Sequence, residues 1–436
     1  MFLNPTNLKI LINCIILLFV LIVTVFVMIK LKFNNPFYKY LFILYIFFWI
    51  PVMLVRPYRG TVQSELDNLI KWAPLMLYGL IGVFARPIMD FFGLYLRNRK
   101  LVVQTSVALI LISFIPMVFV QSTATNIIQT IGVGIGASII GTYELLFKEQ
   151  YGKSKTLLTV SILAIPPLFA DFVTSPIQSA VVSFAKNTNG YDLSKLSILW
   201  IIALVFLVIV FVMAFFIKEN RQFVGDNFQN KVLERRDEKI NFALICLIGA
   251  IILFVKFGNS GSVGTTHLQQ LGIYTNMDVS AYEGYLSTVF SVFQLLGTLL
   301  FGYLVMKNTS NIKIFVIGLS VWIFYHFISI LYFNPIFFIS IHSLNGFAYG
   351  LLYNLLLGYV LSLSFNKKHF TPMGIYQSIL AIGITVSNFF TTFISNNIES
   401  LKLRDSIFII DSTIIVFLVI AMFLFLYVDK KKKLLN

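Results

Sequence analysis

Residues 196–217 read LSILWIIALVFLVIVFVMAFFI, residues 218–239 read KENRQFVGDNFQNKVLERRDEK, and residues 240–258 read INFALICLIGAIILFVKFG. Each apolar run has about the length that an α-helix needs to cross the hydrocarbon core of a bilayer, roughly 20 residues. The segment between them is charged and has no apolar period, which is typical of a linker in water. This stretch therefore predicts two transmembrane helices joined by a polar linker.

The whole chain has the same composition as these runs. Of its 436 residues, 58% are hydrophobic and only 12% are charged, about half the charged fraction of a soluble globular protein. The two cysteines, Cys14 and Cys246, lie inside apolar runs and predict neither a disulfide framework nor a thiolate metal site. The net charge of +15 comes from basic residues at the ends of apolar runs, so we expect a lipid bilayer as partner and no nucleic acid.

Apolar runs predict thirteen membrane spans. They are residues 9–30, 38–58, 68–87, 101–120, 124–147, 156–184, 196–217, 240–258, 283–306, 312–333, 335–363, 372–396 and 406–428. If the basic C-terminal tail is cytoplasmic, most of the 33 Lys and Arg fall on the cytoplasmic side, as the positive-inside rule requires. We therefore expect a multi-pass protein of the plasma or inner membrane with its C-terminus in the cytoplasm.

The linker divides the predicted spans into two sets of six. We expect an extra N-terminal transmembrane helix in residues 1–36, a six-helix bundle in residues 37–217, a cytoplasmic linker in residues 218–239, and a second bundle with a basic tail in residues 240–436. The first span could instead be a secretory signal, but it has one lysine before its apolar run and no small-residue cleavage pattern. The motif SILAI recurs at residues 161–165 and 378–382, in the fifth helix of each half. The chain is thus predicted to be an all-α integral membrane protein of two pseudo-symmetric bundles.

The loop after the second helix of the first half reads GVFARPIMDFFGLYLRNRK from residue 82. A glycine, an acid, and a glycine followed by basic residues resemble the signature of the major facilitator superfamily, and the matching residues are Asp90, Gly93, Arg97, Arg99 and Lys100. The resemblance implies the major facilitator fold and secondary transport, although the spacing before the first arginine departs from the usual form. An acid beside a basic turn could form a charge-assisted latch to the neighbouring helix. The alternative is an ordinary positive-inside loop.

Two cations occupy equivalent depths in the first helix of each half. Arg56 follows Lys39 by the same interval that separates Lys256 from Lys239, which places both about 26 Å from the inner surface. The stretches around them, with AIPPLF at residues 164–169, resemble the organophosphate and phosphate antiporters. That resemblance implies exchange of phosphorylated metabolites for phosphate, with Arg56 and Lys256 binding the phosphoryl group. This chain has lysine where that branch has arginine. Lysine offers a point charge, whereas arginine offers a bidentate fork.

Arg59 adds a third cation near Arg56. Three interpretations of these cations stay open: an anion-binding site, snorkelling to the outer headgroups, or pairing with the outer-loop acids Glu65 and Asp67. Matched depth in the two halves favours the anion site.

Two acids and two histidines are further candidates within predicted spans. Asp171 follows the Pro166–Pro167 pair and is a candidate for proton coupling or for pairing with a cation. Asp411 lies only a turn or two into its span, which favours an interfacial acid. His326 and His342 are on separate helices, where hydrogen-bonded interior histidines are more common than metal ligands.

The resulting prediction is a secondary transporter that moves a small polar solute by alternating access, with an organic anion exchanged for phosphate as the favoured case. Proton-coupled transport of a neutral or cationic solute is the alternative within this class, and a non-transporting receptor is the alternative outside it. No clustered nucleophile, metal constellation or nucleotide-binding motif is evident in the sequence. We therefore expect no enzyme activity, no cofactor and no bound metal, and a monomer that binds a small-molecule substrate.

Overall fold

The computed structural model describes residues 36–67, 73–151, 162–187, 190–219, 231–233, 236–259, 262–277, 283–365, 372–397 and 403–431, with single positions between 11 and 25. The chain divides into two compact units, each described here by itself. Unit 1 comprises Met1–Val232 and Ser364–Ser378, and unit 2 comprises Leu233–Leu363 and Ile379–Asn436.

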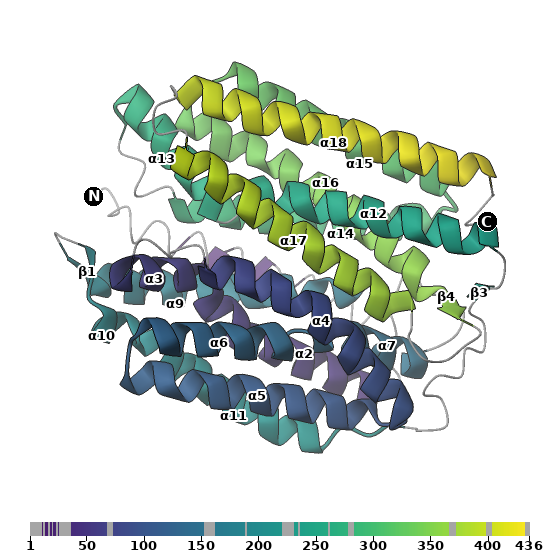
Figure 1. Ribbon diagram of the computed structural model, residues 1–436, viewed down its shortest axis with the longest axis horizontal. Helices are drawn as coiled ribbons and strands as arrows, with labels where there is room; N and C mark the ends of the chain where they lie inside the picture. The colour runs from purple at the N-terminus through teal and green to yellow at the C-terminus, as the bar shows by residue number, and fades with distance from the viewer. Residues whose placement is uncertain are drawn as a thin grey trace. The chain divides into compact units, whose positions relative to one another are not determined.

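Unit 1 contains the helices and short strands of the first half of the chain (Figure 1). They are α2 (Pro36–Val55), η1 (Arg56–Tyr58), α3 (Arg59–Leu66), α4 (Ala73–Tyr95), α5 (Arg99–Phe119), α6 (Thr123–Gly136), α7 (Ile139–Tyr151), α9 (Ile165–Ala185), β1 (Lys186–Asn187), β2 (Gly190–Tyr191), α10 (Leu193–Leu196) and α11 (Ile198–Phe215). Helix α2 packs against α9 and α11, and α5 packs against α6 and α11. The first two turns of α17 also belong to unit 1.

Unit 2 is built around helix α16 (Pro335–Leu361), which contacts α12 (Arg236–Asn259), α13 (Ser262–Thr275), α14 (Glu283–Met306) and α15 (Asn311–Leu331). Most of the second half of α16 is buried, as expected for a helix enclosed on several sides. The remaining elements are α18 (Leu403–Lys431), which packs on α12 and α15, and the rest of α17 (Pro372–Asn397). Strand β3 (Lys231–Leu233) pairs with β4 (Leu363–Phe365) in a two-stranded sheet.

Eleven helices among the described residues are long and apolar enough to cross a membrane. Each corresponds to one of the predicted spans. Of the other two predicted spans, 9–30 lies mostly outside the described residues, so the extra N-terminal helix remains a prediction. The span predicted at 156–184 overlaps α9, which is not one of the eleven, and residues 152–161 lie outside the described residues.

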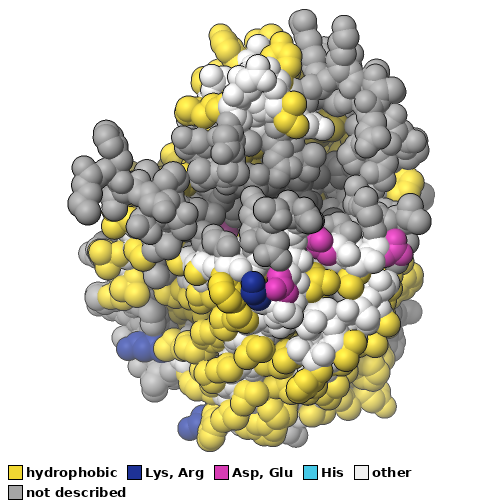
Figure 2. Space-filling model, turned by 90° about the vertical axis from the view of Figure 1, so that its left-hand side faces the viewer, with side chains coloured by type: hydrophobic (Ala, Val, Ile, Leu, Met, Phe, Trp, Pro, Cys, Tyr) yellow, Lys and Arg dark blue, Asp and Glu magenta, His cyan; other side chains and the backbone are white. Residues whose placement is uncertain are grey.

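The outward surface of the helices is apolar, as lipid contact requires. On α11 the side chains of Val205, Val208 and Val212 are exposed although the span around them has a mean hydropathy of 3.3. Figure 2 shows hydrophobic side chains over much of the described surface at one end of the molecule, with few charged groups among them. Soluble monomers rarely expose large contiguous apolar patches.

Helix α4 extends further than the sequence predicted. The predicted span ended at residue 87 and placed Asp90 in or next to a loop, whereas α4 continues to Tyr95. Arg86 and Asp90 therefore lie inside a membrane span, Met76–Tyr95, and both are buried. The helix can continue because each charge has a partner, as described below.

Candidate functional site

The predicted cations of the first half lie at the end of α2. Pro57 has no backbone N–H, so the α-helix ends at Val55 and the chain tightens into the 3-10 turn η1 before α3 begins. This turn places Arg56 and Arg59 against one aromatic ring. The guanidinium carbons of Arg56 and Arg59 lie 5.8 and 4.9 Å from the centroid of Tyr78 on α4, within the range of a cation–π contact.

Arg59 is the more deeply buried of the two arginines, with an exposed fraction of 2%. Within the described part of the chain, its Nε and Nη1 atoms have no hydrogen-bond partner. Burial lowers the pKa of Arg59 from 12.5 to about 10, an effect that Tyr78 opposes and Arg56 reinforces. The group is still a cation at neutral pH. A buried cation with unsatisfied N–H groups favours an anion as ligand.

Polar side chains of α6 lie beside this arginine. The amide nitrogen of Asn126 donates to the backbone oxygen of Arg59 and to Oε1 of Gln63, both at 3.1 Å. One turn further along α6, Gln129 is fully buried, and both polar atoms of its amide lack a hydrogen-bond partner among the described residues. These amides were not predicted from the sequence, although Asn and Gln within an apolar span are a signal that could have indicated them.

Lys256 lies in unit 2, near the end of α12. Its ammonium nitrogen is 4.2 Å from the ring centroid of Tyr349, 5.4 Å from that of Phe257 and 5.6 Å from that of Phe290. Tyr349 lies near the middle of α16, so the ammonium is directed at rings within the bundle. Since Arg56 and Lys256 belong to different units, their facing one cavity stays a prediction.

The C-terminal end of α4 holds the predicted latch residues. Nη1 of Arg99 lies 3.2 Å from Oδ1 of Asp90, and the exposed fractions of the two residues are 1% and 2%. Gly374 on α17 is the close neighbour of Asp90: a Cβ added to this glycine would lie 2.8 Å from Oδ2. Arg97 is exposed at the turn between α4 and α5, where its φ of 48° is left-handed. The structure therefore brings Asp90 and Arg99 together and leaves the side chain of Arg97 outside the pair.

Glu219 caps the start of α5, where backbone N–H groups have no partner within the helix. Its two carboxylate oxygens accept from the backbone N–H groups of Arg99 and Lys100, each at 2.9 Å. The ammonium of Lys100 donates to the backbone oxygen of Phe215 at 2.7 Å. These contacts fix the basic turn to the end of α11.

A second buried polar group of unit 1 was not predicted from the sequence. Arg86 donates from Nη1 to the backbone oxygen of Gln377 at 2.6 Å and lies 3.3 Å from its Oε1, while the amide nitrogen of Gln377 donates to Glu144 at 3.3 Å. Gln377 belongs to the turns of α17 that are part of unit 1. Arg86 lies next to the end of the span predicted at residues 68–87, and the sequence did not indicate its partners, which are far away in the chain.

Asp171 is partly exposed on α9, and its backbone oxygen accepts from the hydroxyl of Thr174 at 3.1 Å. Pro166 and Pro167 occupy the first turn of α9, which begins at Ile165. This is a position where proline is well tolerated. Residues 162 and 163 are also helical and Ala164 is in a turn, so the helical stretch is interrupted directly before the proline pair, where a bend was predicted.

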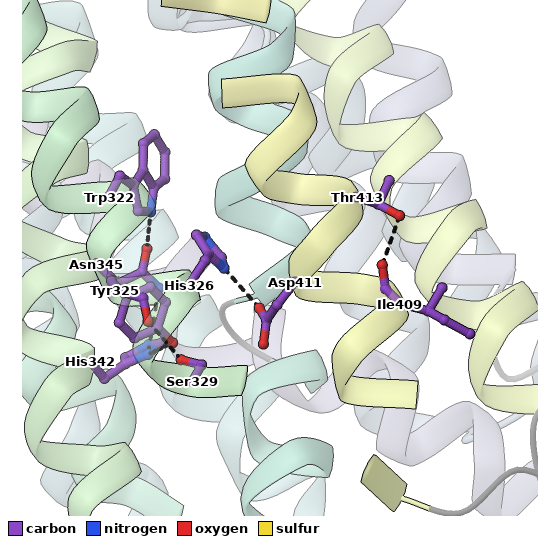
Figure 3. A network of polar contacts seen from close by, with 9 residues as sticks. All are labelled: Trp322, Tyr325, His326, Ser329, His342, Asn345, Ile409, Asp411 and Thr413. Carbon is purple, nitrogen blue, oxygen red and sulfur yellow. Dashed lines mark hydrogen bonds and ion pairs between the residues drawn. The ribbon is translucent and has the colours of Figure 1, made fainter. Parts of the chain in front are cut away.

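Unit 2 contains a buried network of polar side chains on three helices (Figure 3). Nδ1 of His326 on α15 lies 2.8 Å from Oδ1 of Asp411 on α18, and the hydroxyl of Tyr325 lies 2.8 Å from Nδ1 of His342 on α16. The expectation of hydrogen-bonded interior histidines is confirmed for both. Asp411 differs from the interfacial acid that was expected, because it is only 1% exposed and is held by a histidine.

Comparisons with known proteins find similarity in structure alone. No protein-family model matches the chain, and none of the curated proteins matches it in sequence. The human organic anion transporter MFSD10 (TETRAN) has a similar structure, with a TM-score of 0.65 and 11% identity over 89% of this chain and 98% of that chain. A bacterial homologue of the iron transporter ferroportin, in its outward-facing state, gives a TM-score of 0.67 and 12% identity over 90% and 99%. The same protein with soaked iron gives 0.67 and 11%.

These identities are too low to carry a substrate or a family across, but the coverage of both chains is nearly complete. The likeness therefore concerns the fold as a whole. The chain has the all-helical membrane fold of the major facilitator transporters.

Proposed function

We propose that the chain is a secondary transporter that moves a small anion across the membrane by alternating access. The observation that carries this proposal is Arg59, a buried guanidinium whose Nε and Nη1 have no hydrogen-bond partner among the described residues. An anion bound there would satisfy these N–H groups and offset the cost of burying the charge. Arg56, against the same ring of Tyr78, adds a second positive charge.

Lys256 is the proposed contribution of the second bundle. Its ammonium lies over the ring of Tyr349 within unit 2, which supports a role in the bundle interior over snorkelling to headgroups. In the proposed cycle, cations donated by both bundles repel one another when the site is empty. A phosphorylated or carboxylated anion neutralises them and permits the change of access, which favours exchange of one anion for another. The name of MFSD10 as an organic anion transporter agrees with this class of solute.

The proposed latch is the Asp90–Arg99 pair at the C-terminal end of α4, and the exposed side chain of Arg97 lies outside this pair. Asp90 is buried against Gly374, so loss of its charge would loosen a contact that joins α4 to α17. Asp171 is retained as a proposed coupling residue on α9. Substitutions of the latch pair or of Asp171 are expected to change the rate of anion exchange. They should leave the affinity for the anion unchanged.

The experiment that tests the proposal uses proteoliposomes loaded with labelled inorganic phosphate, with phosphate or glycerol phosphate added outside. We expect counterflow in the wild type, and a loss of about tenfold or more in Arg59→Gln, Arg56→Gln and Lys256→Gln, because each removes a charge-assisted hydrogen bond. Asp90→Asn should slow counterflow without weakening the thermal stabilisation that phosphate gives the purified protein.

The matched control is Arg97→Gln, which removes an exposed cation from the same unit and should leave counterflow within about twofold, since exposed charges contribute little. Absence of counterflow with every anion, together with no thermal stabilisation by any of them, would contradict the proposal.

A further inference from the structure

The network in unit 2 contains one acid and one base in direct contact inside a membrane span. Asp411 is 1% exposed and His326 is fully buried, and the atoms in contact are 2.8 Å apart. Oδ2 of Asp411 has no hydrogen-bond partner among the described residues. Replacing such a pair by apolar residues is often neutral or stabilising, so a buried ion pair is weak evidence for a structural role. Ionisable groups at membrane depth more often mark a functional site.

Hydrogen-bond donors distinguish the two histidines of the network. Trp322 Nε1 can only donate, and it lies 2.7 Å from Oδ1 of Asn345, which turns the amide nitrogen of Asn345 toward Nδ1 of His342 at 3.5 Å. The hydroxyl of Tyr325 approaches the same ring nitrogen at 2.8 Å. With two donors around it, Nδ1 of His342 is an acceptor, so this ring is neutral and carries its proton on Nε2.

Nδ1 of His326, in contrast, faces a hydrogen-bond acceptor. The acceptor is a carboxylate, which only accepts when ionised, so this nitrogen carries a proton in either charge state of the ring. A second proton on Nε2 converts the ring to an imidazolium that the carboxylate stabilises. Of the two rings, His326 is therefore the one that can gain and lose a charge.

Other ionisable groups around the pair come from each helix packed against it. They are Tyr325 on α15, His342 on α16, His267 on α13, and Lys256 on α12, whose ammonium is turned to the ring of Tyr349. His267 lies outside the membrane spans. Burial lowers its pKa, with Asp411 opposing and His326 reinforcing that effect, so its charge is coupled to the pair.

Charge balance gives the pair two states. With the proton on Nε2 of His326 the pair is an imidazolium and a carboxylate, with a net charge of zero. Without that proton the pair carries one negative charge, which a low-dielectric interior disfavours unless water or a cation reaches it. The two groups therefore bind this proton jointly. The proton is lost only when water or a cation can reach the site.

We propose that the His326–Asp411 pair is a proton-binding site of the second bundle, which takes up and releases one proton on Nε2 of His326 as the transporter cycles. The pair shares no residue with the proposed anion site, and the proposal does not depend on which solute moves. It adds a protonatable pair on α15 and α18 to Asp171 on α9, the coupling residue proposed above.

The test is nitrogen NMR of the full chain labelled with ¹⁵N-histidine in lipid nanodiscs, between pH 5 and pH 9. Only four histidines are present in the sequence, so His326→Gln identifies one signal by its loss. We expect His326 to change from imidazolium to neutral ring within this range, and His342 to remain neutral with its proton on Nε2. In Asp411→Asn the midpoint of the His326 transition should move by at least one pH unit toward acid, a tenfold loss in proton affinity.

Two results would overturn the proposal. One is a His326 ring that keeps a single charge state from pH 5 to pH 9 in the wild type, a result that needs no variant to fold. The other is a midpoint that moves by less than one pH unit in Asp411→Asn. Should the asparagine variant not fold, Asp411→Glu keeps the carboxylate, and its His326 must still change charge state within the range for the proposal to stand.

Discussion

Burial of Arg59 has a cost that can be expressed as free energy. The pKa of this residue falls from 12.5 to about 10, and each pKa unit corresponds to about 1.4 kcal/mol, so the buried charge destabilises the fold by about 3 kcal/mol at neutral pH. Because the pKa is lower in the folded state, this cost is present throughout the range below pH 10. It is relieved only as the pH rises through the folded value toward the unfolded one.

Arg59→Met tests this account, since methionine keeps an apolar stem and removes the charge. We expect the thermal midpoint of the purified protein to rise by a few degrees, because the relieved desolvation exceeds the cation–π contact with Tyr78 that is lost. The stabilisation by phosphate should disappear at the same time. Arg97→Met, on an exposed side chain, should change neither quantity. A midpoint lowered by several degrees in Arg59→Met would mean that the guanidinium contributes net stability.

At the scale of elements, close packing of α14 on α16 depends on glycine. A Cβ added to Gly350 on α16 would lie 2.3 Å from the backbone oxygen of Gln294 on α14, and one added to Gly346 would lie 2.1 Å from that of Phe290. Backbone atoms cannot move aside as side chains do. The two helices therefore approach as closely as small-residue interfaces in membranes allow.

Gly350→Ala is expected to destabilise unit 2. Forcing the helices apart costs about 1–3 kcal/mol or more, which exceeds the gain of about 1 kcal/mol in helix propensity. The matched control is Gly141→Ala on α7, where the nearest atoms are side-chain carbons of Met373 and Gln377 at 3.2 and 3.4 Å. Thermal unfolding in detergent should show a clear loss for the first variant and a change within about 1 kcal/mol for the second. Equal effects would show that the backbone contact is not limiting.

Helices were predictable to the extent that their apolar runs are uninterrupted. The limits of α4 were missed because Arg86 and Asp90 resemble loop residues in sequence, whereas in the fold Arg86 is hydrogen-bonded to Gln377 and Asp90 is paired with Arg99. The partner of Arg86 lies 291 positions away in the chain. No local pattern reports a neutralising contact at that distance.

The site residues show the same limit, because the contacts that define them join residues far apart in the chain. Arg59 was identified as a cation near Arg56, but its burial depends on α3 folding back against α4 and α6, which no periodicity in residues 59–66 predicts. His326 and Asp411 are separated by 85 positions and were assessed one at a time. A charged residue in a span is visible in the sequence, and its partner becomes visible only in the fold.

For the molecule as a whole, the fold does not determine the orientation in the membrane. The charge distribution predicts it. Basic residues collect in alternate loops and in the C-terminal tail, and the positive-inside rule predicts that this tail and the loop containing Lys307 are cytoplasmic. The loop at the other end of α15 would then face outward. The two ends of this one helix make a direct test, because Lys307 and Tyr332 flank it and both are exposed.

Single cysteines at these two positions should react oppositely with a membrane-impermeant maleimide. In a background of Cys14→Ser and Cys246→Ser, we expect Tyr332→Cys to be labelled on intact cells and Lys307→Cys only after the membrane is opened. The reason is that a helix of this length crosses the hydrocarbon core once and leaves its flanking residues on opposite sides. Labelling of Lys307→Cys on intact cells would show that the orientation is the reverse of the predicted one. Arg56 and Arg59 would then lie near the cytoplasmic surface, and the proposed transporter would present its anion-binding arginines to the cell interior.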